Sequence, residues 1–218
     1  MPAPARPTSR AIARSVPGRL AVCVLGIVLL GFGVSLTVRA DLGLSPWDVL
    51  HQGLADKIGI PMGTISIVVG AVVLLAWIPL RQRPGIATVL NVVGVGLVID
   101  LCLAVLPETS NLAARWALLL AGLVLLALAT GLYIGAGLGS GPRDGLMMGF
   151  ASRGISVRVA RTAVELVVLG TGFLLGGRVG IGTVVLAVGI GPLVHVALDR
   201  LATAAHQPPR PEPALVAR

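Results

Sequence analysis

Charged, aromatic and cysteine residues are all scarce in this sequence. Only 12% of the 218 residues are charged and 3% are aromatic, and there are two cysteines. Soluble domains carry about 25% charged residues, whereas here 56% of the residues are hydrophobic and the mean hydropathy is +0.96. These values exclude an ordinary soluble domain. They indicate an all-α, polytopic membrane protein, whose first partner is the lipid bilayer.

Motifs for metal, phosphate and covalent chemistry are also missing. The sequence has no Cys/His cluster with zinc-ligand spacing, no Walker-type phosphate loop and no visible nucleophile–base arrangement. Cys23 and Cys102 fall inside apolar segments near opposite membrane surfaces, so both are interpreted as packing residues rather than as a disulfide. We therefore predict no metal, no cofactor and no enzymatic activity.

The net charge of +8 would fit a nucleic-acid-binding protein, but the sequence has no basic domain and no aromatic platform for bases. Cytoplasmic loops of membrane proteins collect Arg and Lys, and this rule explains the excess. No nucleic-acid partner is predicted.

Six apolar segments are long enough to cross a bilayer, which takes about 20 helical residues. They run from Leu20 to Val38, Met62 to Leu80, Ile86 to Leu106, Leu112 to Ile134, Val157 to Leu175 and Ile181 to Leu201. Residues 1–18 and 203–218 are rich in proline and are predicted to be disordered.

The sequence contains an internal duplication. Residues 40–55 (ADLGLSPWDVLHQGLA) match residues 136–151 (AGLGSGPRDGLMMGFA) at eight of 16 positions, with an offset of 96. Residues 85–96 match residues 180–191 at seven of 12 positions, with an offset of 95. Self-similarity of this kind shows that one structural unit occurs twice.

Each copy of the first motif predicts a broken helix. Pro46 and Pro142 suit the first helical position, where a missing N–H is no loss. Asp48 and Asp144 then fall in the first turn, facing the positive helix end, and Ser45 can act as a cap. We expect each copy to end a membrane helix, turn on glycines and start a short broken or re-entrant helix.

The orientation in the membrane follows from the basic residues. With six spans and a cytoplasmic N-terminus, 13 Arg or Lys residues fall on the cytoplasmic side and four fall outside. The four outside residues are Arg39, Lys57, Arg115 and Arg178. This bias places both termini on the cytoplasmic side of the cell membrane.

Each copy holds three spans, which is an odd number, so the two copies should have opposite orientations. We predict membrane repeat 1 at residues 19–106 and membrane repeat 2 at residues 107–202. Inverted repeats with broken helices near their interface are typical of secondary transporters.

Three stretches resemble a known family, the YczE/YyaS/YitT group of bacterial integral membrane proteins, and within it the YczE-like branch. They are Leu42–Leu54 (LGLSPWDVLHQGL), Ile58–Thr64 (IGIPMGT) and Pro84–Asn91 (PGIATVLN). The resemblance covers roughly residues 31–198. It implies a multi-pass membrane protein and names no substrate.

The second copy departs from the first at two positions of the motif. Arg143 stands where the first copy has Trp47, and Met147 stands where it has His51. The two copies therefore need not have symmetric roles. We expect His51 to reach the membrane interface rather than a substrate.

Ionisable side chains inside a span are costly and are functional candidates. Glu165 lies about eight residues into its span, roughly 12 Å deep at 1.5 Å per residue. Its spacing from Arg161 predicts an ion pair. Glu165 is the strongest single candidate for a substrate or coupling residue, and Arg161 is its predicted partner.

The remaining candidates each have a structural alternative. Asp48 and Asp144 could hold a cation or proton, or they could simply cap their helices. Asn91 could line a cavity or make an interhelical hydrogen bond. Asp100 and His195 occupy equivalent positions, and they could act as a gating pair or be solvated at the two interfaces.

Two functions follow from these patterns. The favoured one is a secondary transporter or exporter of an unidentified small molecule, with the two short helices as opposed gates. The alternative is a membrane scaffold or accessory protein without transport. A midplane cavity that reaches Glu165 would favour transport, and a dry, tightly packed interior would favour the scaffold. The sequence leaves association into a homo-oligomer open.

Overall fold

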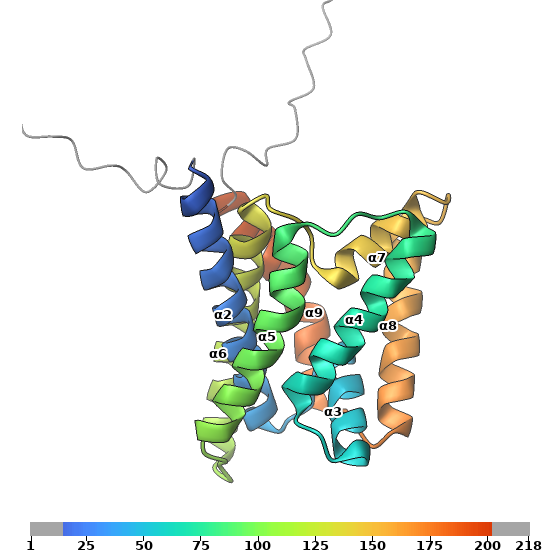
Figure 1. The fold of residues 1–218 in the computed structure, drawn as a ribbon. Helices are drawn as coiled ribbons and strands as arrows, with labels where there is room; N and C mark the ends of the chain where they lie inside the picture. Colours follow the sequence, from blue (N-terminus) through green and yellow to red (C-terminus); the bar gives the residue numbers. More distant parts are fainter. Residues whose placement is uncertain (1–14, 202–218) are drawn as a thin grey trace, which may run out of the picture.

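The computed structural model describes residues 15–201, which form eight helices and no strand (Figure 1). The helices are α2 (Val16–Ala40), α3 (Pro46–Ile58), α4 (Met62–Leu80), α5 (Ile86–Val105), α6 (Leu112–Gly135), α7 (Pro142–Ala151), α8 (Val157–Leu174) and α9 (Ile181–Leu201). These bounds agree closely with the six predicted apolar segments and the two predicted short helices.

The first span starts earlier than predicted, at Val16. Residues 16–18 were predicted to be disordered, but they form the first turn of α2. The side chain of Ser15 accepts a hydrogen bond from the amide of Gly18 at 3.2 Å, and Pro17 fits the first helical turn. The predictions of disorder for residues 1–14 and 203–218 lie outside the described residues.

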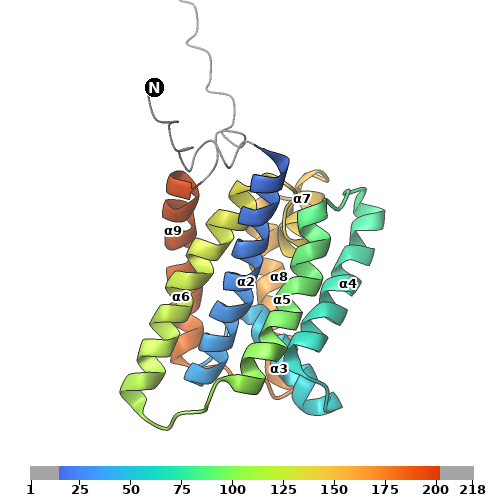
Figure 2. The same cartoon turned by 60° about the vertical axis from the view of Figure 1, so that its left-hand side comes forward.

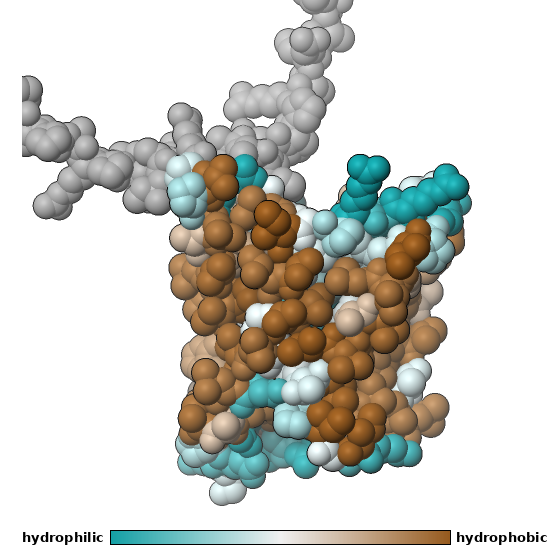
Figure 3. Space-filling model, in the orientation of Figure 1, coloured by the Kyte–Doolittle hydropathy of each residue, from teal (hydrophilic) through white to brown (hydrophobic). Residues whose placement is uncertain are grey.

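Five of the helices, α2, α4, α5, α6 and α9, are long and apolar enough to cross a membrane by length and composition. α8 is not among them, since its 18 residues carry three charged side chains, Arg158, Arg161 and Glu165. The space-filling view shows a broad hydrophobic belt between two polar ends (Figure 3). The chain is therefore a polytopic helical membrane protein.

Four long helices form one layer, in the spatial order α9, α6, α2, α5 (Figure 2). Glycines bring the helix axes close together. A Cβ added at Gly26 would lie 2.7 Å from the backbone of Tyr133, where α2 crosses α6. A Cβ at Gly94 would lie 2.8 Å from Ile27 in the α5–α2 contact.

The other four helices, α3, α4, α7 and α8, form a second layer. α3 packs on α8 and α4, and α7 packs on the same two helices. The two short helices lie at opposite ends of this layer, with α3 low and α7 high in Figure 1. The described chain ends lie at the same end of the molecule as α7, which is called the terminal end below; the other is called the α3 end.

Contacts between the two halves of the chain occur in equivalent pairs. The guanidinium of Arg19 donates hydrogen bonds to Ala136 O at 2.7 Å and to Gly137 O at 2.6 Å, at the end of α6. Arg115, 96 positions later, donates to Ala40 O at 2.8 Å at the end of α2, and also to the carbonyl of Asp41. Each arginine thus supplies donors to the open carbonyls at the C-terminus of the other helix.

Backbone hydrogen bonds between the two halves also occur as an equivalent pair. The amide of Gly182 donates to Leu42 O at 2.7 Å, and the amide of Ala87 donates to Leu138 O at 3.2 Å. Each bond ties the turn after the first helix of one half to the third long helix of the other half. As a result, neither half is a separate domain, because each supplies the hydrogen-bond partners that the other needs.

Both cysteines are free, as predicted. Cys23 is fully buried in the first layer and Cys102 is partly exposed on α5.

Candidate functional site

A cavity of about 480 Å³ lies between the two layers. Its lining comes from all eight helices and is mostly apolar, with polar groups concentrated on α3, α7 and α8. The volume is typical of sites that hold a small organic molecule, for which about 300–1,000 Å³ is usual.

The cavity crosses the middle of the molecule: on α2 and α4 its lining comes mostly from the half nearer the α3 end, and on three other helices it extends toward the terminal end (Figure 1). Its lining on α6, which runs from Leu126 to Ile134, comes from the last half of that helix, and its lining on α9, from Ile190 to Leu198, comes from the last half as well. On α8 the lining residues are Val157, Arg161 and Glu165, in the first half. All three of these half-helices lie at the terminal end (Figure 1).

Two equivalent helix pairs beside the cavity differ in how tightly they pack. α4 and α5 pack closely, and a Cβ added at Gly63 would lie 2.0 Å from Gly96 O. The equivalent pair, α8 and α9, hardly touches. Arg158 and Gly191 occupy the matching positions there, and Gly191 faces open space. The cavity lining is therefore less tightly packed between α8 and α9 than between α4 and α5.

Asp48 is buried at the start of α3, beside two potential cations. Its Oδ1 lies 3.6 Å from His51 Nδ1 and 3.9 Å from Arg143 of α7. The Ser45 hydroxyl donates a short hydrogen bond to its Oδ2. A buried carboxylate is costly without partners of this kind. Asp48 is thus an internally compensated acid at the cavity wall.

This arrangement corrects two predictions. Ser45 precedes α3 as expected, but its side chain makes no capping bond to the helix backbone, because its hydroxyl donates to Asp48 instead. His51 does not reach the membrane interface; it is 2% exposed and lines the cavity. The side chains of α3 therefore face inward, toward the space between the layers.

Arg143 links the two short helices. Its guanidinium lies over the indole ring of Trp47, 4.9 Å from the ring centroid, as well as near Asp48. A cation over an aromatic face is attracted by the ring quadrupole. Arg143 and Trp47 occupy equivalent positions in the two copies, but nothing in the sequence predicts that they meet.

Asp144 has a different environment from Asp48. It is exposed to the cavity, and it accepts a hydrogen bond from the Tyr133 hydroxyl at 3.2 Å. Within residues 15–201, no Arg, Lys or His lies within ion-pair distance of its carboxylate. Tyr133, which is buried on α6, was not among the predicted site residues.

Glu165 and Arg161 form the predicted ion pair on α8, with a distance of 3.0 Å between Arg161 Nε and Glu165 Oε1. Both side chains line the cavity and both remain accessible. Asn91 of α5 also lines the cavity. It is 8% exposed, and its Nδ2 has no hydrogen-bond partner among the described residues. A buried amide without a partner is unusual and costly.

The last two predicted residues lie elsewhere. Asp100 accepts hydrogen bonds from Gly63 N at 2.6 Å and from Thr64 Oγ1 at 2.7 Å, so it caps the start of α4. His195 is exposed on α9 and lies 3.7 Å from Asp199. The structure thus brings together Asp48, Asp144, Asn91, Arg161 and Glu165, and it places Asp100 and His195 outside the cavity lining.

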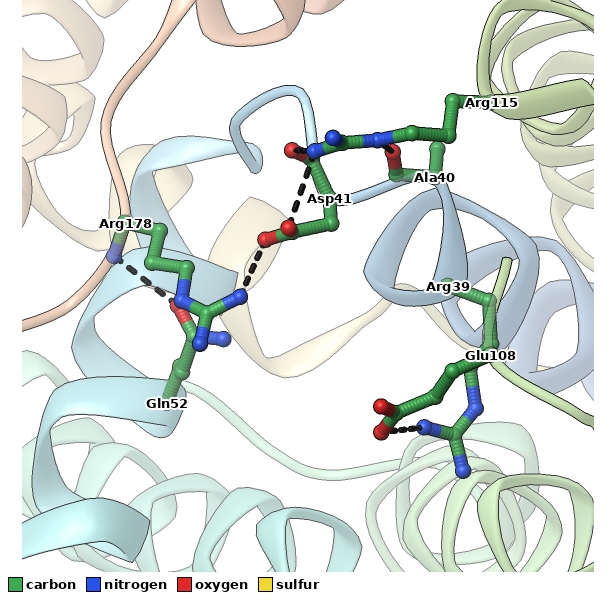
Figure 4. Close-up of polar contacts among 7 residues, drawn as sticks. All are labelled: Arg39, Ala40, Asp41, Gln52, Glu108, Arg115 and Arg178. Carbon is green, nitrogen blue, oxygen red and sulfur yellow. Dashed lines mark hydrogen bonds and ion pairs between the residues drawn. The ribbon is translucent and has the colours of Figure 1, made fainter. Parts of the chain in front are cut away.

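A second polar cluster, here called the Asp41 cluster, lies at the α3 end (Figure 4). The Asp41 carboxylate, in the turn after α2, pairs with Arg115 at 2.8 Å and with Arg178 of the α8–α9 turn. The amide of Arg178 also donates to Gln52 Oε1 at 2.8 Å. The hydrogen bond and charge of Asp41 raise the pKa of the Arg178 guanidinium, so this arginine stays charged.

The equivalent position at the terminal end has no such cluster. The residue that matches Asp41 is Gly137, and the one that matches Arg178 is Arg83. An ion pair of this kind therefore joins the layers at the α3 end and cannot form between the matching positions at the terminal end.

Comparison with known proteins places this architecture in a family. Residues 17–199 match the model of a family described as "Family of unknown function (DUF6198)". The chain belongs to this family. The match spans both short helices and nearly the whole of the long ones, so the family is defined by the entire helical unit rather than by the duplicated motif alone.

Curated relatives agree with this assignment. The chain is 37% identical over 190 residues to a protein of Haemophilus influenzae named as uncharacterized, covering 87% of each chain. It is 36% identical to the Bacillus subtilis "Uncharacterized membrane protein YczE", covering 80% of this chain and 83% of the relative. It is 33% identical to the Bacillus subtilis YyaS protein, covering 79% and 88%. No solved structure matches. The resemblance to the YczE and YyaS proteins is thus confirmed, and the chain is a multi-pass membrane protein.

Proposed function

We propose that the protein is a secondary transporter or exporter of a small organic molecule. The observation that carries this proposal is the cavity between the layers, which reaches Glu165 and gathers Asp48, Asp144 and Asn91. A scaffold would need no polar cavity at this depth. Ionisable groups inside a membrane are expensive and usually mark a substrate or proton pathway.

The proposed architecture is two inverted repeats with six spans, in which α8 is a span in addition to the five long apolar helices. Its charged residues Arg161 and Glu165 pair with each other and face the cavity, which offsets their cost in a membrane. Its other faces are apolar, with Leu166, Val167 and Phe173 exposed. The equivalent hydrogen bonds of Arg19 and Arg115 support the duplication.

The proposed orientation puts the terminal end and both chain termini in the cytoplasm of the cell. Three of the four basic residues expected outside are held by acids at the α3 end, namely Arg39 by Glu108 and both Arg115 and Arg178 by Asp41. The support for this orientation is the count of Arg and Lys, with 13 on the expected cytoplasmic side and four outside. We infer that in this orientation the cavity is open to the cytoplasm and closed to the outside.

Alternating access follows from the difference between the two helix pairs. In the described state α4 is packed on α5, while α8 is separated from α9. We infer that the outward-open state exchanges these arrangements, so that α8 closes on α9 and α4 separates from α5. The second layer, with α3 and α7, would move against the first layer around the cavity, as in other transporters built from repeats.

Reconstitution tests this function. Purified protein is placed in proteoliposomes on a solid-supported membrane, and charge movement is recorded on rapid addition of small organic amines, carboxylates and neutral solutes. We expect at least one solute to produce a saturable signal. We expect the Glu165→Gln variant to lose this signal or its pH dependence, because an amide in place of the carboxylate cannot take up a proton. The matched control is Asp199→Asn, which removes an acid outside the cavity.

Two outcomes would contradict the proposal. One is a folded wild-type protein that gives no signal with any of the three solute classes. The other is a Glu165→Gln variant whose signal and pH dependence equal those of the wild type, which would remove Glu165 from the mechanism.

A further inference from the structure

The charges around the cavity do not balance. Three acids line it, and two of them have basic partners: Asp48 lies near Arg143, and Glu165 pairs with Arg161. Asp144 is paired with neither arginine; the hydroxyl of Tyr133 is the group that donates to it. The site as a whole therefore carries one uncompensated negative charge in a mostly apolar surrounding.

The positive groups of the cavity are already engaged. Arg143 is held between Asp48 and the face of Trp47, and Arg161 is held by Glu165 one turn away. An anionic ligand could accept from the remaining N–H groups of these arginines, but it would face three acids, Asp48, Asp144 and Glu165, that two arginines do not balance. A cationic ligand would leave both pairs intact, and it would supply the charge that Asp144 lacks. Like-charge contacts in such a site are strongly disfavoured.

Asn91 gives an independent indication that a ligand binds here. Its side chain is buried, it lines the same cavity, and its Nδ2 has no hydrogen-bond partner within the described part of the chain. Leaving a buried donor unsatisfied costs about 1–3 kcal/mol, so a ligand that offers an acceptor atom would recover this loss. The equivalent residue in the other half is Leu186, whose side chain has no hydrogen-bonding group.

The lining between these polar groups is apolar, and it favours a ligand with an apolar part. Val69, Val73, Val92 and Val95 form apolar lining on α4 and α5. The lining on α9 is also apolar, with Ile190, Val194 and Leu198. A strongly hydrated ion would not favour these walls, whereas a compact apolar group would.

We propose that the cavity binds an amphiphilic organic amine: an ammonium group at Asp144, an apolar body between α4, α5 and α9, and an acceptor atom toward Asn91. This assignment rests on the proposed transport function for its biological meaning, but the binding itself does not require transport. The class of ligand follows from the one acid without a basic partner and the one buried amide without an acceptor in the cavity lining that the structure describes.

A matched set of three ligands tests the assignment. Phenethylamine, phenylacetate and 2-phenylethanol share the same ring and chain and differ in charge. Binding to the full-length protein in detergent is measured by isothermal titration calorimetry. We expect phenethylamine to bind at least about tenfold more tightly than phenylacetate or 2-phenylethanol. We expect Asp144→Asn, which can still accept from Tyr133, to remove this preference.

The control variant is Asp199→Asn, which removes one negative charge outside the cavity and should leave the preference intact. A second probe, 2-amino-1-phenylethanol, adds an acceptor oxygen to the amine. It should bind more tightly than phenethylamine in the wild type but not in Asn91→Leu, whose new residue is the one found at the equivalent position in the other half.

The results separate this inference from the proposed function. The inference is overturned if phenylacetate or 2-phenylethanol binds as well as the amine, if Asp144→Asn keeps the preference, or if none of the probes binds. If phenylacetate both binds and gives a transport signal, transport stands and the amine assignment fails. If the amine binds as expected but gives no transport signal, the ligand class stands and the proposed function fails.

Discussion

Arg143 lies over the ring of Trp47, and the two residues occupy equivalent positions of the duplicated motif, 96 residues apart. In the proposed repeat architecture, equivalent positions would meet in this way near the axis that relates the two copies. Two arginines here would repel one another, and two tryptophans would leave Asp48 without its cation. The departure of the second copy from the first therefore creates the contact that joins the two short helices.

The proximity of Arg143 to the buried carboxylate of Asp48 predicts that loss of Arg143 destabilises the protein. Arg143→Gln leaves a buried carboxylate with His51 as its remaining potential cation, and we expect it to lower the free energy of unfolding by roughly 1–3 kcal/mol. Asp48→Asn in the same chain should recover much of this loss, because the unpaired charge is gone. Thermal unfolding in detergent, followed by fluorescence, measures both variants. Equal melting temperatures for Arg143→Gln with and without Asp48→Asn would contradict the pairing.

Two helical glycines, one in a crowded position and one in an open position, allow a matched test of helix packing. Gly145 of α7 lies against Trp77, and an added Cβ would be 2.0 Å from a ring carbon, whereas Gly170 of α8 faces open space. We expect Gly145→Ala to cost about 1–3 kcal/mol of stability by overpacking. Gly170→Ala should be neutral or stabilising by up to about 1 kcal/mol, since Ala favours helices.

The control for this prediction is the Trp77→Phe background, which lacks the ring atoms that the new Cβ would meet. Gly145→Ala should cost less there than in the wild type. Melting temperatures of the four variants form a double-mutant cycle, and strict additivity in that cycle would show that the two residues do not clash.

The Asp41 cluster predicts a change in access from the α3 end. Arg178→Gln removes an ion pair that joins the layers there, and such exposed pairs contribute about 0.2–1 kcal/mol. We expect the outward-open population to rise by about two- to fivefold. A Ser66→Cys reporter in the cavity, with Cys23→Ala and Cys102→Ala, should then react faster with an impermeant maleimide added to intact cells.

Arg39→Gln is the control for the Asp41 cluster. It breaks a salt bridge at the same end of the molecule, to Glu108, but that bridge does not reach the α8–α9 turn. The labelling rate should stay at the wild-type value. A rise of the same size in both variants would show that surface charge, rather than closure between the layers, controls access.

The proposed closure of α8 on α9 in the outward-open state predicts a disulfide crosslink between these two helices. Cysteines introduced by Arg158→Cys and Gly191→Cys occupy the positions that match the tightly packed Gly63 and Gly96. In the described state these positions are apart, so a disulfide should form slowly. It should form faster when Arg178→Gln is added, and it should stop transport until a reductant is supplied. Fast crosslinking in both backgrounds, with transport intact, would contradict the exchange.

The ends of the helices could be predicted from the sequence because they depend on local chemistry. Pro46 and Pro142 fix the first turns of α3 and α7, and glycine or polar turns end the apolar segments at nearly the observed residues. The start of α2 was placed too late, because the capping role of Ser15 competed with a proline-rich composition that suggested disorder.

The site was predictable only in part. Glu165 and Arg161 are four residues apart on one helix, so their ion pair follows from helix geometry. Asp100 was assigned to the same group by its place in the duplication, yet it caps α4 because Gly63 lets that helix start within reach of α5. His51 was expected at the interface, since its burial beside Asp48 depends on how α3 packs.

The sequence by itself determined the membrane class, the duplication and the helix boundaries, because hydrophobic length, repeated motifs and turn residues act over short distances along the chain. The tertiary structure decided which polar groups share a cavity and which acid is left without a partner. These features depend on contacts between residues far apart in the chain, such as Asp48 with Arg143 and Asp41 with Arg178. They also depend on the difference between α4–α5 and α8–α9, two helix pairs of similar sequence pattern that pack differently.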